Sequence, residues 1–82
     1  MNELEQVLFD LVEPMVNDVT SLTVKTMPSI NDNEILLYVY AKSEDVARLI
    51  GKQGVMAIAI RQMMTVASRV KNKRVSIKFE SY

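Results

Sequence analysis

The stretch that decides the fold is residues 43–61, which read SEDVARLIGKQGVMAIAIR. Apolar residues recur at helical spacing on both sides of the loop Gly51, Lys52, Gln53 and Gly54, so the stretch predicts two helices joined by a tight loop. These two glycines are the only ones in 82 residues, and glycine permits backbone conformations and close approaches that a Cβ forbids. The loop is therefore expected to end one helix and open the next where free backbone N–H groups can face an anion.

The two helices beside this loop are predicted from their apolar spacing. The first follows Ser43, which is expected to cap it, and its expected buried side is Val46, Leu49 and Ile50. The second runs from Gly54 to about residue 69. Its expected core positions are Ala57, Ile60, Met64 and Ala67, with Met63 filling a gap in the core.

Toward the N-terminus the sequence predicts one more helix. Residues 4–12 place apolar side chains at helical spacing and acidic ones on the opposite face. Asn2 and Glu5 resemble a capping pair at its start, and Pro14 stops it. This helix is expected to pack through its apolar side, with a solvated acidic face.

Three segments alternate as β-strands do. Residues 22–26 and 34–41 are expected to pair as an antiparallel hairpin around a turn at residues 31–33. Residues 75–79 alternate as a last strand after a turn at residues 71–73. The predicted order of elements is α-β-β-α-α-β, an α+β fold with one domain over residues 1–82.

Composition excludes several classes of protein. The chain has no cysteine and no histidine, so it lacks a thiolate metal site and the commonest general base, and neither an enzyme, a metal nor another cofactor is expected. Its N-terminus has no basic and apolar regions of a signal peptide. The longest apolar run, residues 35–41, is far below the ~20 residues that span a bilayer. A soluble protein of the cytoplasm, without a membrane span, is expected.

Charge is divided unevenly along the chain, although its formal net value is zero. Residues 1–45 carry two basic and nine acidic residues, a net charge of −7. Residues 46–82 carry eight basic residues and one acidic residue, a net charge of +7. Because local clustering matters more than the total for contact with phosphates, the basic half that holds the glycine loop favours a nucleic-acid ligand.

With the loop in this order, residues 46–61, VARLIGKQGVMAIAIR, resemble the core of a type II KH domain. Two strands precede the loop and one follows it, whereas a type I domain would show the reverse balance. Over essentially its whole length the chain is similar to KhpA, a family of small bacterial single-KH-domain RNA-binding proteins with an I-G-K-Q-G loop. The resemblance implies a type II KH fold, in which a three-stranded mixed sheet carries three helices on one face.

The resemblance also implies a function. Family members lack enzymatic activity and bind single-stranded RNA, often as homodimers or with a second KH-containing protein, in RNA-level regulation linked to cell shape and division. RNA would lie in a groove formed by the helix at residues 43–50, the loop, the long helix and the edge of the second strand. In this groove the loop, Gly51 to Gly54, would hold a phosphate through its N–H groups, Lys52 and Gln53. The expected apolar floor is Val46 and Ile50, and the expected flanking charges are Arg48, Arg61 and Lys42.

The chain departs from the family's pattern just after the loop. The family usually has a basic residue directly after the second glycine and another three positions on, where this chain has Val55 and Ile58. Affinity for RNA is therefore expected to be low in one domain, and Val55, Met56 and Ile58 form a predicted surface for a partner. An alternative stays open, in which the chain is a protein-interaction module on a KH fold with weak or lost RNA binding.

Two tyrosines raise a rival geometry for RNA. Tyr38 and Tyr40 share the face of the second strand opposite its apolar residues, and aromatic rings on an open sheet face can stack bases. Tyrosines are also good strand formers, and the chain contains no sequence typical of RRM domains. The basic turn of Lys71, Lys73 and Arg74 is expected to be a general electrostatic aid.

Overall fold

The computed structural model describes residues 1–69 and 72–82, so Lys71 of the predicted basic turn lies outside the described residues. The elements follow the order α1 (Glu3–Val12), β1 (Thr23–Met27), β2 (Glu34–Ala41), α2 (Ser43–Ile50), α3 (Val55–Ser68) and β3 (Arg74–Ser81). Short 3-10 turns lie at η1 (Glu13–Met15), η2 (Val19–Ser21) and η3 (Lys52–Gly54). This order confirms the predicted succession of helices and strands.

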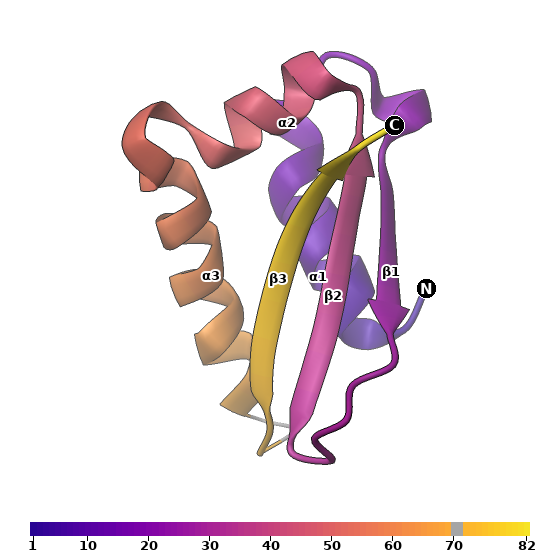
Figure 1. Cartoon of the computed structure of the whole chain (residues 1–82), viewed down its shortest axis with the longest axis vertical. Coiled ribbons are helices and arrows are strands. Elements are labelled where there is room, and N and C mark those ends of the chain that lie inside the picture. Colours follow the sequence, from indigo (N-terminus) through magenta and orange to yellow (C-terminus); the bar gives the residue numbers. More distant parts are fainter. Residues whose placement is uncertain (70–71) are drawn as a thin grey trace.

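The three strands form a mixed sheet in the order β1-β2-β3. β1 pairs antiparallel with β2, as the hairpin prediction required, and β3 pairs parallel with β2. The helices pack on one face of the sheet, with α1 behind the strands in Figure 1. The prediction that the edge of the second strand borders the groove is wrong, because β2 is paired on both sides and β3 is the free edge beside α3.

The core lies between the sheet and the helices. Side chains at alternate positions of β2, such as Leu37 and Val39, are fully buried, as the period of a strand requires. Ile60 and Met64 of α3 are also buried, which confirms their predicted core positions. The prediction for Met63 is wrong: it is 56% exposed, because successive helical residues point about 100° apart and only Met64 faces the sheet.

The caps of α1 and α2 differ. Asn2 Oδ1 accepts the Glu5 N–H over 2.8 Å, and the Glu5 carboxylate accepts the Asn2 N–H over 2.9 Å, which confirms the capping pair. Glu5 also accepts the Thr26 N–H over 2.7 Å, so the start of α1 is tied to β1. At α2 the predicted cap is wrong, because Ser43 is already helical and Lys42 holds the cap position without a side-chain hydrogen bond.

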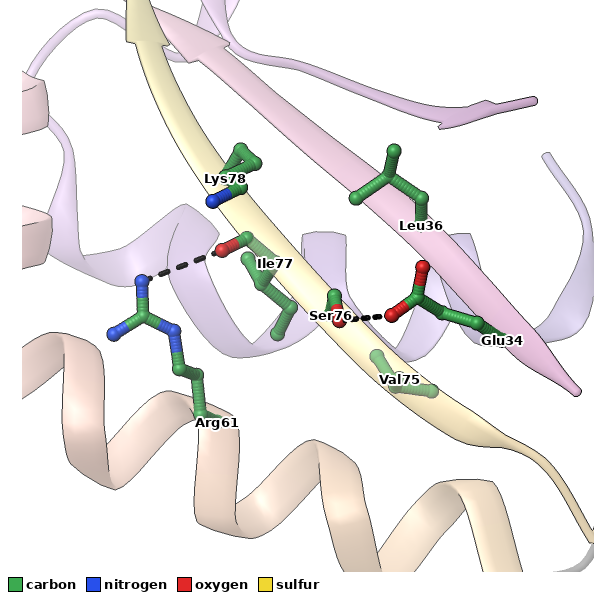
Figure 2. A pocket seen from close by; sticks show the side chains of 7 residues that line it. All are labelled: Glu34, Leu36, Arg61, Val75, Ser76, Ile77 and Lys78. Carbon is green, nitrogen blue, oxygen red and sulfur yellow. Dashed lines mark hydrogen bonds between the residues drawn. The ribbon is translucent and has the colours of Figure 1, made fainter. Parts of the chain in front are cut away.

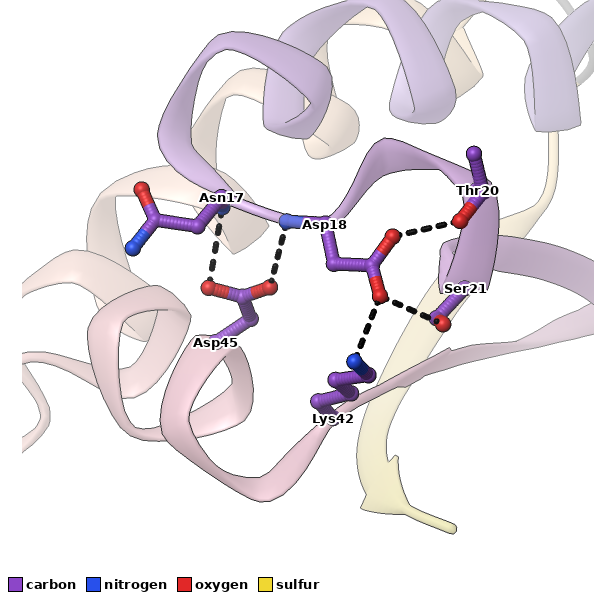
Figure 3. A network of polar contacts seen from close by, with 6 residues as sticks. All are labelled: Asn17, Asp18, Thr20, Ser21, Lys42 and Asp45. Atoms are coloured by element: carbon purple, nitrogen blue, oxygen red, sulfur yellow. Dashed lines mark hydrogen bonds and ion pairs between the residues drawn. The ribbon is translucent and has the colours of Figure 1, made fainter.

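A buried carboxylate ties α2 to the segment after α1 (Figure 3). Asp45 is 2% exposed, and its two oxygens accept the backbone N–H groups of Asn17 and Asp18, each over 3.0 Å. These two donors hold the pKa of Asp45 below its ordinary value. Lys42 Nζ lies 2.8 Å from Asp18 Oδ2, so the lysine predicted to flank RNA is instead paired with a carboxylate.

Candidate functional site

The loop between α2 and α3 takes its shape from residues with positive φ. The Gly51 N–H donates to Ala47 O over 2.9 Å and closes α2, and the Gly54 N–H donates to Gly51 O over 3.1 Å and closes the loop. The φ angles are 76° at Gly51, 57° at Gln53 and 78° at Gly54. Such angles suit glycine and are strained for glutamine. The loop is thus a fixed turn whose middle residues, Lys52 and Gln53, are exposed.

Gly51 and Gly54 are required to be glycine for different physical reasons. A Cβ on Gly51 would lie 2.7 Å from Met56 Cγ and 3.0 Å from Met56 N, so the start of α3 approaches this backbone too closely for a side chain. A Cβ on Gly54 would meet no atom within 4 Å. Met56, predicted to belong to a partner surface, is half-buried because it packs over Gly51. Only the positive φ calls for glycine at position 54.

α2 presents a mixed surface beside the loop. Val46 is half-buried, while Ile50 is 38% exposed, which contradicts its predicted place on the buried side of the helix and leaves it available as a floor. Arg48 is exposed, with Nη1 3.9 Å from Asp45 Oδ1. Leu49 is fully buried and anchors the helix. The end of α2 therefore offers one apolar and one cationic side chain next to the loop.

Arg61 lies where α3 faces the free edge of β3. Its Nη2 donates to the Ile77 carbonyl over 3.3 Å (Figure 2). Its guanidinium also lies 5.8 Å from the centre of the Phe79 ring. An open hollow of about 520 Å³ adjoins it, lined by Glu34, Leu36, Arg61, Val75, Ser76, Ile77 and Lys78. Sequence reasoning missed β3 as the wall of this groove, although the predicted last strand supplied the residues.

Apolar side chains are exposed along the outer face of α3. Val55 is 60% exposed, Ile58 52% and Val66 60%, and their spacing puts them on one side of the helix. These three residues are called the α3 stripe below. Val66 was not predicted, although its position, two to three helical turns after Val55 and Ile58, could have indicated it.

Two absences hold for residues 1–69 and 72–82. No group of three or more His, Cys, Asp or Glu residues in this part of the chain is placed to hold a metal ion. None of its helices is long and apolar enough to cross a membrane.

Comparison with known proteins shows the family of this chain. A family model described as KhpA/KhpB, KH domain, matches residues 5–79. The chain belongs to this family of KH domains. The match confirms the predicted resemblance and extends from within α1 to within β3. Among curated proteins, none matches this chain.

Two solved structures share the fold of this KhpA/KhpB-type domain. One is a variant of Aquifex aeolicus Era bound to GDP.AlF4−, with a TM-score of 0.64 and 17% identity over 95% of this chain. The other is Era in complex with MgGDPNP and nucleotides 1506–1542 of 16S ribosomal RNA, with a TM-score of 0.63 and 16% identity over 95% of this chain. The chain spans 29% of each Era chain. The likeness confirms the type II KH fold.

Proposed function

We propose that this KH domain binds single-stranded RNA without catalysing a reaction, as one domain over residues 1–82 of a bacterial cytoplasmic protein. The observation that carries the proposal is the loop, in which Gly51 and Gly54 present Lys52 and Gln53 to solvent at the N-terminus of α3. The partial positive charge of that helix end and the lysine ammonium both favour an anion. G-x-x-G loops of KH domains clamp about four nucleotides of backbone.

The groove beside the loop has the parts that unpaired bases need. Ile50 and Val46 supply an apolar floor on α2, and Arg61 supplies a cation on α3, beside the hollow at β3. Arg48 is the second flanking cation. The Arg61 guanidinium is already held by the Ile77 carbonyl and the Phe79 ring, so little side-chain entropy is lost when it meets a ligand. Few cations line this groove, which predicts weak binding that falls as salt rises.

A charge reversal in the loop tests this proposal. Lys52→Asp with Gln53→Asp should abolish binding to a short labelled single-stranded RNA, measured by fluorescence anisotropy, because two carboxylates would repel the phosphate. Both residues are exposed, so circular dichroism should show an unchanged fold. Asn72→Asp with Lys73→Asp is the matched control, because it changes the charge equally at exposed positions beyond the other end of α3 and should keep most of the affinity.

Two results would contradict the proposal. The first is unchanged RNA affinity in a correctly folded Lys52→Asp/Gln53→Asp protein, which would remove the loop from the site. The second is tighter binding of duplex RNA or DNA than of single strands at the same salt concentration, because a groove of this kind needs splayed bases.

We further propose that the α3 stripe pairs this chain with a second copy or with another KH-containing protein, in post-transcriptional regulation linked to cell shape and division. Val55, Ile58 and Val66 expose large apolar side chains on one side of a helix, and a chain of this size gains stability from association. Helix faces of this kind can meet themselves across a two-fold axis.

Ile58→Asp tests the pairing. In sedimentation at high micromolar concentration it should shift a dimer toward monomer. Val7→Asp is the matched control, because Val7 is an exposed apolar residue of α1, at 40% exposure, outside the stripe. A wild-type protein that sediments as a monomer would exclude self-pairing. Pairing that depends on Ile58 in a protein that binds no RNA would favour the alternative function, a protein-interaction module on a KH fold.

A further inference from the structure

The face of the sheet opposite the helices carries all three tyrosines of the chain. In Figure 1 the strands face the viewer with α1 behind them, and no described element crosses in front of them. The Tyr38 and Tyr40 rings stack with their centroids 5.9 Å apart and their planes 29° apart. The Tyr82 ring lies 6.1 Å from Tyr40, and its hydroxyl donates to Thr23 Oγ1 over 3.2 Å. Tyr38, Tyr40 and Tyr82 are called the tyrosine row below.

Basic side chains stand on both sides of one end of this row. In the sheet register Tyr38 lies opposite Lys25 of β1 and Lys78 of β3, and residues directly opposite one another project from the same face. Both lysines are exposed, and neither forms a salt bridge with a described residue. At the other end Glu80 lies opposite Tyr40. The positive part of this face is therefore centred on Tyr38.

We propose that this sheet face is a second contact surface for single-stranded RNA, with bases stacked on the tyrosine row and phosphates held by Lys25 and Lys78. Aromatic rings beside cations are the features by which proteins hold unpaired strands with little sequence preference. The proposal rests on the proposed RNA-binding function and extends it beyond the four nucleotides of the loop. A protein partner fits this face less well, because an apolar surface laid on it would bury two ammonium groups that form no salt bridge with a described residue.

The hollow beside β3 gives a single-stranded RNA a path between the loop and the tyrosine row. The same hollow is lined by Arg61, on the helix side of the sheet, and by Leu36 and Lys78, on its open side (Figure 2). Twelve stacked nucleotides extend about 41 Å at ~3.4 Å each. The longest extent of the domain is 32 Å, which is shorter than this RNA, so we expect twelve nucleotides to reach from the loop, around the edge of β3, to the tyrosine row.

The spacing of the rings indicates where a base would stack. A base inserted between two rings needs about 6.8 Å, twice the stacking distance of ~3.4 Å. The Tyr38 and Tyr40 centroids are 5.9 Å apart, which is too close without a shift of the rings. Bases are therefore expected on the outside of the row, and most strongly at Tyr38, where the two lysines lie.

Residue composition makes the test direct, because the tyrosines report only on the sheet face and the two glycines only on the loop. NMR spectra would be recorded while the protein is titrated with uridine tetranucleotide and with uridine dodecanucleotide. With the tetranucleotide, the Gly51 and Gly54 amides should shift and the tyrosine ring protons should stay. With the dodecanucleotide, both sets should shift, and Tyr38 should shift furthest.

Variants measure the strength of the contact. Tyr38→Leu with Tyr40→Leu keeps apolar side chains in the strand but removes the stacking surface, and should weaken dodecanucleotide binding roughly fivefold or more while tetranucleotide binding is unchanged. Lys25→Glu should also weaken only the longer RNA and reduce the salt dependence of its binding, because Lys25 lies opposite Tyr38 and outside the hollow beside Arg61. Lys73→Glu is the matched control and should weaken the longer RNA less, because Lys73 lies outside this face.

Three outcomes decide the proposal separately from the loop assignment. Tyrosine rings that stay unmoved at saturating dodecanucleotide while the glycine amides shift would overturn the second surface and leave the proposed function standing. Rings that shift while the glycine amides stay would support the sheet face and refute the loop. Equal affinity of the Tyr38→Leu/Tyr40→Leu variant and the wild type for the dodecanucleotide would also overturn the second surface.

Discussion

Replacing Gly51 by alanine should destabilise the domain far more than replacing Gly54 by alanine. At Gly51 the backbone has φ 76° and ψ 174°, a region that essentially only glycine occupies, at a cost of about 1–3 kcal/mol for other residues. The new Cβ would also lie 2.7 Å from Met56 Cγ and 3.0 Å from Met56 N, and overpacking of this kind costs about 1–3 kcal/mol. The expected loss is therefore about 2–6 kcal/mol.

The Gly54 variant isolates the cost of the backbone angle. Gly54 has φ 78° and ψ 12°, a left-handed conformation that costs other residues about 1–2 kcal/mol and that Gln53 already adopts. A Cβ there meets open space, so about 1–2 kcal/mol is the whole expected loss. A domain of this length has a total stability of about 4–12 kcal/mol, so Gly51→Ala can approach global unfolding and Gly54→Ala cannot.

Urea denaturation followed by circular dichroism measures both losses, with an unchanged m-value as the check on two-state unfolding. Met56→Ala added to Gly51→Ala removes the Cγ overlap but leaves Met56 Cβ and N, at 2.9 and 3.0 Å. The double variant should therefore recover only part of the stability, relative to Met56→Ala alone. Equal losses for Gly51→Ala and Gly54→Ala would refute the close approach as the reason for glycine at position 51.

Two further stability predictions follow from burial and charge. Met64→Ala should lower the free energy of unfolding by about 2–5 kcal/mol, because Met64 is fully buried. Met63→Ala should change it by no more than about 0.5 kcal/mol, because Met63 is 56% exposed. Similar losses for the two variants in urea denaturation would contradict this orientation of α3. The pKa of Asp45 is lowered in the folded state, so the stability it contributes is present above its unfolded pKa of about 3.9 and is lost as pH falls through the folded pKa. Asp45→Asn should therefore be less stable than wild type at pH 7, and the gap between their urea midpoints should narrow from about pH 5 downward; a gap independent of pH would exclude the ionised carboxylate as the cause.

The helices, the strands and the loop could be predicted from the sequence because the helical and the strand periods of the apolar residues were clear. Helical spacing in residues 43–69 and strand alternation in residues 34–41 each matched one template, and both glycines fell between the helices. The edge at which β3 joins was not predictable, because all three strands alternate alike and the long connection through α2 and α3 permits either side of the hairpin. The wall of the groove was therefore misassigned to β2.

The hydrogen-bond and ion-pair partners of polar side chains could not be predicted from the sequence either. Ser43, Glu44 and Asp45 all suit the start of a helix, and only the folded arrangement selects Asp45, by bringing the free N–H groups of Asn17 and Asp18 to its carboxylate. The same segment also supplies Asp18, with which Lys42, predicted to flank RNA, forms a salt bridge. In each case the deciding partner lies more than 20 residues away, where spacing rules along the chain carry no information.

The parallel pairing of β3 sets the order in which the domain can be built. In the hairpin, Met27 pairs with Leu36, nine positions away, whereas in the β2–β3 pair Glu34 lies opposite Arg74, which is 40 positions away. Distant pairings form late, because the entropy of a longer loop must be lost before any contact stabilises the pair. A nascent chain can thus form its hairpin and its glycine loop before β3 is present. At that stage it still lacks the Ile77 carbonyl, to which Arg61 donates a hydrogen bond. The groove comes into existence only when residues 74–81 leave the ribosome, so a partly synthesised chain would carry the loop without the wall against which a base could rest.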